Sequence, residues 1–177
     1  MLEAAASNRR ANSGILTHSY VIYTSWSLPR TISEGIMAVI HLINPYDGTA
    51  MGSMQGVGGR QVPLGLAYIA ATLREDGHDV MITDEVIMQD GLKAVSSKVP
   101  DAILLSVYPS SMNRARSIVK RARSLNPKTL VIAGGAIAQA TTAESYMLDL
   151  DADVIVLGEG ELSAPKLIKE PKSRWSA

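Results

Sequence analysis

Five apolar runs recur along the chain and are separated by segments with helical spacing. The runs are rich in Val, Ile and Leu, and most are continuous rather than alternating, which is typical of strands buried on both faces of a parallel sheet. They occupy residues 37–43, 79–83, 102–107, 129–133 and 153–157. The pattern therefore predicts five parallel strands, each joined to the next by a crossover connection.

The intervening segments carry helix signals of different strength. Residues 63–76 begin with Pro63 and are followed by Gly77, residue types that favour the first turn and the C′ position of a helix. Residues 111–125 repeat apolar side chains at helical spacing and stop before Pro127. The alternation predicts a doubly wound α/β domain with a flavodoxin-like (Rossmann-like) parallel sheet, although the pattern leaves the strand order open. Weaker helical patterns cover residues 86–97, 138–149 and 161–169.

Residues 1–36 differ from the rest of the chain. They are rich in Ser, Asn, Arg and Thr and show no sustained period. We interpret them as an N-terminal tail or as an upstream extension of an open reading frame that could begin at Met37. The alternative is an edge strand from Ile15 to Thr24. The predicted α/β domain covers residues 37–165, and residues 166–177 form a C-terminal tail.

Composition narrows the classes of function. The 177 residues are 46% apolar and 19% charged, which indicates one globular domain. Because 17 Lys and Arg balance 17 Asp and Glu, we expect no nucleic-acid partner and no membrane partner. The chain has no Cys, which excludes disulfides and cysteine-ligated iron–sulfur clusters. Without an apolar run of spanning length or a clean signal sequence, a cytoplasmic location is expected.

The residues that follow the predicted strands are the candidates for ligand binding, since doubly wound sheets bind ligands at the carboxyl ends of their strands. A long loop rich in Gly and Met follows the first strand and lacks a phosphate-binding fingerprint. The glycine pair after the fourth strand either lets a ligand approach the backbone or makes a tight turn. The Gly-Glu-Gly-Glu after the fifth strand is unusual for a turn, although a solvated turn stays open. The candidate site residues are Asn44, Ser106, Val107, Tyr108, Gly134, Gly135, Ala136, Gly158, Glu159, Gly160 and Glu161.

The order of these segments resembles the cobalamin-binding domain of radical S-adenosylmethionine proteins, among them the anaerobic magnesium-protoporphyrin ester cyclase. The resemblance covers about 37–165. It implies a corrin over the carboxyl edge of the sheet and a nucleotide tail beside the strands. Ser106 and the glycine pair would lie near the tail, and residues 158–161 near the corrin rim. The resemblance rests on Pro-Leu-Gly-Leu-Ala at 63–67, Gly-His-Asp-Val at 77–80, Pro-Asp-Ala at 100–102, Gly-Gly at 134–135 and Gly-Glu-Gly-Glu at 158–161.

Three departures limit what the resemblance implies. Many members continue the glycine pair with Pro-His, whereas this chain has Ala136 and Ile137. The Asp-x-His-x-x-Gly motif of methionine-synthase-type domains is absent, so we expect cobalamin without a protein histidine ligand and no other metal-ligating residue. The C-x-x-x-C-x-x-C motif of the radical domain is absent as well. We therefore expect no iron–sulfur cluster and no catalysis by this chain alone.

These observations leave three hypotheses. The first is a cobalamin-binding module, truncated before a radical domain, whose partner is a radical S-adenosylmethionine catalytic domain or chain. The second is a flavodoxin-like protein that binds a nucleotide or a flavin. The third is a non-binding interaction domain in which the glycines only make turns.

Overall fold

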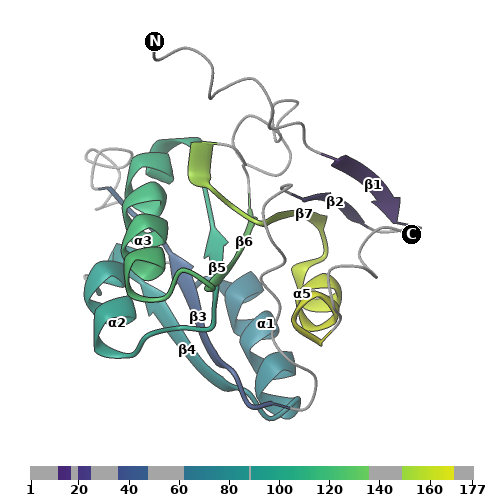
Figure 1. The fold of residues 1–177 in the computed structure, drawn as a ribbon, viewed down its shortest axis with the longest axis horizontal. Helices are drawn as coiled ribbons and strands as arrows, with labels where there is room; N and C mark the ends of the chain where they lie inside the picture. Colours follow the sequence, from purple (N-terminus) through teal and green to yellow (C-terminus); the bar gives the residue numbers. More distant parts are fainter. Residues whose placement is uncertain are drawn as a thin grey trace.

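The computed structural model describes residues 36–47, 62–87, 89–135 and 149–169, together with the backbone of residues 12–16 and 20–24. These residues form one sheet with helices on both faces (Figure 1). The strands are β1 (Asn12–Leu16), β2 (Tyr20–Thr24), β3 (Val39–Asn44), β4 (Asp79–Asp84), β5 (Ala102–Ser106), β6 (Leu130–Gly134) and β7 (Val154–Gly158). The helices are α1 (Leu64–Glu75), α2 (Gly91–Ser97), α3 (Met112–Leu125) and α5 (Gly160–Lys169), with 3-10 turns η1 (Glu85–Ile87) and η2 (Pro109–Ser111).

The seven strands lie in the order β1-β2-β7-β6-β5-β3-β4. The five strands from β3 to β7 are all parallel, in the order β4-β3-β5-β6-β7. This is the flavodoxin-like arrangement, and it confirms the predicted doubly wound, five-stranded parallel sheet. Because β4 is added on one side of β3 and β5 on the other, the strand order reverses between β3 and β5.

An antiparallel hairpin extends the parallel sheet. Strand β1 pairs with β2, and β2 pairs with β7 so that Tyr20 lies opposite Gly158 and Thr24 opposite Val154. The structure thus places two strands inside residues 1–36, where we expected a tail or an extension. The alternative of an edge strand from Ile15 to Thr24 overlaps both. The β-branched and aromatic residues of β2 favour a strand, but the polar residues around them hide that preference in a composition average.

The predicted elements match the observed ones closely within the described residues. Each of the five predicted strands agrees with an observed strand to within two residues at either end. The helix expected over 86–97 divides into η1 and α2, because Asp90 caps α2 by accepting hydrogen bonds from the backbone N–H groups of Leu92 (2.9 Å) and Lys93 (3.3 Å). These bonds, led by that from Lys93, lower the pKa of Asp90. The helix expected over 138–149 lies almost entirely outside the described residues.

Two apolar layers hold the helices to the sheet. Side chains alternate between the two faces of a strand, so Ile103 and Leu105 pack toward α2 and α3, whereas Leu104 packs toward α1 and α5. The buried apolar side chains in the described segments are Ala, Val, Leu, Ile and Met, in keeping with a sequence that has no Phe. Helix α5 therefore lies beside α1 on one face of the sheet (Figure 1). No helix in the part that the structure describes is long and apolar enough to cross a bilayer.

Two histidines, one fully buried and one half-buried, are poor proton acceptors. His41 in β3 is fully buried, and within the described residues neither ring nitrogen has a hydrogen-bond partner. The Nδ1 atom of His78 accepts a hydrogen bond from the backbone N–H of Ala38 at 3.3 Å, which requires an unprotonated nitrogen there. Burial is the main cause that lowers the pKa of both histidines below the ordinary value of 6.5, and Lys98 lowers that of His41 further.

We therefore expect the free energy of unfolding to fall as the pH drops below about 6.5. Below that pH the histidines of the unfolded chain bind protons that His41 and His78 of the folded chain do not, so protons favour unfolding. Urea unfolding at a series of pH values between 8 and 5 measures this slope. The variant His41→Leu should show a flatter profile. Identical pH profiles for this variant and the wild type would contradict a neutral His41.

Candidate functional site

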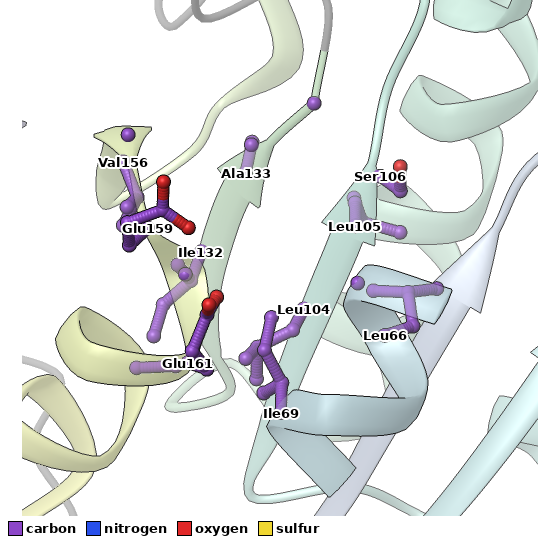
Figure 2. A pocket seen from close by; sticks show the side chains of 16 residues that line it. Leu66, Ile69, Leu104, Leu105, Ser106, Ile132, Ala133, Val156, Glu159 and Glu161 are labelled. Carbon is purple, nitrogen blue, oxygen red and sulfur yellow. The ribbon is translucent and has the colours of Figure 1, made fainter. Parts of the chain in front are cut away.

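A groove of about 270 Å³ opens between α1 and α5 at the carboxyl ends of β5, β6 and β7 (Figure 2). Its floor is apolar and takes one side chain from each strand, namely Leu104, Ile132 and Val156. Ile69 of α1 and Ala164 of α5 line the walls. The groove therefore offers an apolar slot beside three parallel strands, closed on both sides by helices.

The mouth of the groove is lined by different side chains from its floor, because every second residue of a strand points to the same face. Residues two apart in a strand share a face, so the position two residues after each floor residue lies above it. These positions are Ser106, Gly134 and Gly158, and all three line the groove. The side chains thus become small or polar where the strands end, and a ligand in the groove could approach the backbone there.

The two adjacent glycines differ in what they tolerate. A Cβ atom at Gly134 would meet only the backbone oxygen of Val156, at 3.6 Å, so this position has room for a side chain. Gly135 has a φ of +88°, and a Cβ atom there would lie 3.0 Å from the backbone nitrogen of Val107 and 3.1 Å from the Ser106 hydroxyl. Gly135 is therefore required by the turn itself, whereas Gly134 keeps space open at the groove.

Two carboxylates stand at the β7 side of the mouth. Glu159 is exposed and Glu161 is partly buried in the first turn of α5. Figure 2 shows both on the opposite side of the groove from Ser106 and Leu66. In the part of the chain that the structure describes, neither carboxylate forms an ion pair or a side-chain hydrogen bond, so both can accept hydrogen bonds from a ligand.

Close packing of the two helices depends on Gly160. A Cβ atom at this residue would lie 2.9 Å from Cδ1 of Ile69. The absence of a side chain at the start of α5 therefore lets α1 and α5 approach each other beneath the mouth of the groove. Gly160 thus has a role in packing that is separate from its predicted role in the site.

The other predicted site residues lie elsewhere. The amide of Asn44 donates a hydrogen bond to Oδ1 of Asp84 at 2.9 Å, so it joins β3 to β4 and does not line the groove. Val107 is buried, and its N–H donates to the backbone oxygen of Gly134 at 2.9 Å. Tyr108 is exposed and outside the groove, and Ala136 lies outside the described residues. Binding roles for these residues stay predictions. Among the described side chains, no group of three His, Asp or Glu could hold a metal ion.

Comparison with known proteins assigns this chain to a family. The model of the B12 binding domain matches residues 54–168, well over half of the 177 residues. The chain belongs to the B12-binding domain family. The matched residues of this B12-binding domain include α1 and the three strands that form the groove, and they end one residue before the end of α5.

Curated relatives of this B12-binding domain are larger proteins. An uncharacterized methyltransferase of Pyrococcus horikoshii is 33% identical over 116 residues, which cover 63% of this chain and 25% of the relative. The hopanoid C-3 methylase of Methylococcus capsulatus is 31% identical over 116 residues, which cover 62% of this chain and 22% of that enzyme. The matched region thus spans about a quarter of the length of the curated relatives.

The residues of the groove fit the ligand of such a domain. Cobalamin is large, carries an apolar aromatic base on its nucleotide tail and is fringed with amides. An apolar floor suits the base, since each Å² of apolar surface buried there would stabilise the complex by about 25 cal/mol. The bare backbone around Gly134 suits close approach, and the carboxylates of Glu159 and Glu161 can accept hydrogen bonds from amide N–H groups. The side chains that line the groove are therefore compatible with cobalamin, the ligand of the family.

Proposed function

We propose that this domain binds cobalamin with the corrin over the carboxyl edge of β5, β6 and β7 and the nucleotide tail in the groove between α1 and α5. The observation that carries the proposal is the apolar groove beside these strands, which opens at Gly134. A flavin or nucleotide site in a fold of this kind needs phosphate-binding groups, and the groove has apolar residues and two carboxylates there instead.

We propose a different role for each kind of residue in the groove. Leu104, Ile132 and Val156 pack against the tail and keep water out of the slot. The Ser106 hydroxyl can donate or accept a hydrogen bond at the point where the tail meets the corrin. Glu159 and Glu161 accept hydrogen bonds from amides at the corrin rim.

We also propose that no histidine of the domain binds the cobalt. Of the histidines in the described segments, His41 is buried within β3 and His78 precedes β4 at the opposite edge of the sheet. Neither lines the groove.

The names of the relatives suggest the kind of reaction in which such a domain takes part. Their names describe a methyltransferase and a methylase, and this chain matches only about a quarter of each. Bound cobalamin supplies a cobalt centre that can carry a methyl group. We propose that the domain presents this group to a catalytic domain of the radical S-adenosylmethionine type, in the same chain or in another.

A spectroscopic experiment tests cobalamin binding directly. The purified protein is mixed with hydroxocobalamin, passed over a desalting column and examined in the visible range. We expect about one corrin to remain per chain, with a spectrum that lacks the features of histidine ligation. A parallel sample with flavin mononucleotide serves as a control. A colourless protein after the first column, or retention of the flavin instead, would contradict the proposal.

A further inference from the structure

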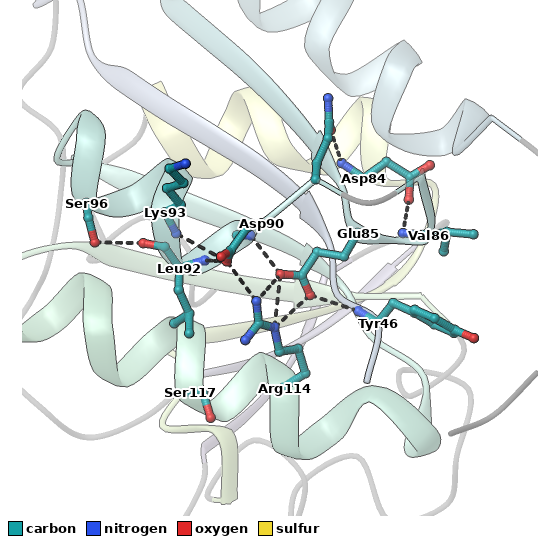
Figure 3. A network of polar contacts seen from close by, with 12 residues as sticks. Tyr46, Asp84, Glu85, Val86, Asp90, Leu92, Lys93, Ser96, Arg114 and Ser117 are labelled. Carbon is teal, nitrogen blue, oxygen red and sulfur yellow. Dashed lines mark hydrogen bonds and ion pairs between the residues drawn. The ribbon is translucent and has the colours of Figure 1, made fainter. Parts of the chain in front are cut away.

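Glu85 joins four segments through one buried carboxylate (Figure 3). Its side chain is only 3% exposed. Oε2 accepts a hydrogen bond from the backbone N–H of Tyr46 at 3.0 Å, and Oε1 accepts one from the backbone N–H of Gly91 at 2.7 Å. Arg114 donates to both oxygens, through Nε at 3.0 Å and through Nη2 at 2.7 Å. The hydrogen bonds from Arg114 to Glu85 raise the pKa of Arg114 above its ordinary value, so its guanidinium stays charged.

The partners of Glu85 lie on both sides of the point where the strand order reverses. Tyr46 is in the loop that leaves β3, two residues after the strand ends. Arg114 is in the first turn of α3, which follows the loop that leaves β5. In open α/β sheets the crevice between two such loops is where ligands bind. Glu85 therefore connects the first residues after β3 to the helix that follows β5.

We propose that Glu85 is a positioning residue for cofactor binding, which holds the exit of β3 at a fixed distance from the exit of β5. The inference rests on the proposed function, because Ser106, the last residue of β5, lines the groove proposed to hold cobalamin. A loop that is already held in its bound position loses less entropy when the ligand arrives, so the affinity is higher. Asn44, the last residue of β3, also fixes the exit of this strand, because its amide donates a hydrogen bond to Asp84, the residue before Glu85.

The chemistry of a carboxylate explains why the position needs Glu rather than Gln. Both oxygens accept hydrogen bonds, and each faces a backbone N–H as well as the guanidinium of Arg114. A glutamine has one acceptor oxygen, so its amide group would place donor against donor on one side. Glu85→Gln is therefore expected to release either Tyr46 or Gly91 and to loosen the exit of β3 relative to the exit of β5.

A matched control separates positioning from simple stability. Arg123, on the same helix as Arg114, forms an ion pair with the buried carboxylate of Asp153 at 2.9 Å, just before β7 begins. This pair lies at the amino ends of the strands, away from the groove. Asp153→Asn makes the same chemical change as Glu85→Gln at the opposite edge of the sheet.

The experiment measures binding to the wild type and both variants by visible titration, at a temperature where circular dichroism shows each to be folded. The ligands are hydroxocobalamin and cobinamide, the corrin without its nucleotide tail. We expect Glu85→Gln to weaken both ligands by a similar factor of about ten. Asp153→Asn should lower the Tm but leave both Kd values within twofold of the wild type, as expected for an independent site.

Each result has a definite meaning. Equal losses of affinity in Glu85→Gln and Asp153→Asn, or a wild-type Kd in Glu85→Gln, would overturn the inference. If Glu85→Gln does not fold, Arg114→Lys takes its place, since lysine keeps the charge but cannot bind both oxygens in the same way. A wild-type Kd in that variant would overturn the inference too. A wild-type protein that binds neither ligand refutes the proposed function itself.

Discussion

Valine at position 134 is expected to abolish the retention of cobalamin on a desalting column. Gly134 lies two residues after Ile132 on the same face of β6, so a side chain there projects into the mouth of the groove. The nearest atom to its Cβ position is 3.6 Å away, which allows the fold to accept the change. Filling a packed site with extra methyl groups costs about 1–3 kcal/mol, which corresponds to roughly a tenfold to hundredfold rise in Kd.

Two comparisons make this result specific to the tail. Cobinamide lacks the tail, so its Kd should rise less than that of cobalamin in Gly134→Val. Gly77→Ala strains the backbone at the end of α1, where φ is +85°, far from the groove; it therefore controls for general destabilisation and should leave both Kd values unchanged. Gly135→Val is a poorer test, since its φ of +88° makes any side chain strained. Unchanged Kd values in Gly134→Val would show that the tail does not enter the groove.

Asp153→Asn is expected to lower the free energy of unfolding by about 3 kcal/mol, in the range found when one partner of a buried ion pair is removed. The Asp153 carboxylate accepts hydrogen bonds from Nη2 of Arg123 at 2.9 Å and from the backbone N–H of Val131 at 2.8 Å. Its side chain is 3% exposed and that of Arg123 is 10% exposed, so water cannot replace the lost contacts easily. Urea unfolding at pH 7.5 measures the change.

Asp151→Asn is the matched control for this prediction. Asp151 contacts the same guanidinium, but its side chain is 58% exposed. Exposed ion pairs contribute little, so its loss should cost less than about 1 kcal/mol. Similar changes in both variants would mean that burial does not set the strength of the Arg123 contacts.

The sequence predicted the parallel sheet well because its strands are buried on both faces. Such strands read as continuous apolar runs, and the crossover rule leaves few ways to connect them. The hairpin of β1 and β2 was harder to predict, because it lies in a polar segment. Its strands complete an edge of the sheet rather than form the core.

The floor of the groove was not predicted, because Leu104, Ile132 and Val156 look like ordinary core residues. Whether an apolar residue of a strand is covered depends on how closely α1 and α5 approach, and that distance is not encoded in any one segment. A usable signal exists, since each floor residue lies two positions before a predicted site residue: Ser106, Gly134 and Gly158. Reading backward along one face of each strand would have found the floor.

The position of Asn44 shows the effect of strand order. The residue is the last of β3 and was predicted to meet the ligand, like the residues after the other predicted strands. In the structure its amide reaches across to Asp84, because β4 is the neighbour of β3 on the side away from the groove. Strand order could not be derived from the pattern of apolar runs, so this partner could not be foreseen.

The pairing of β2 with β7 also covers the edge that β7 would otherwise expose. Strand β2 pairs with β7 from Val154 to Gly158, and β6 pairs with the other edge of β7 at Val154 and Ile155. A shorter chain that started at Met37 would leave a row of unpaired N–H and C=O groups on β7, and such an edge recruits strands from other molecules. Strand β2 thus satisfies the backbone groups along this edge of the strand that leads into Glu159 and Glu161.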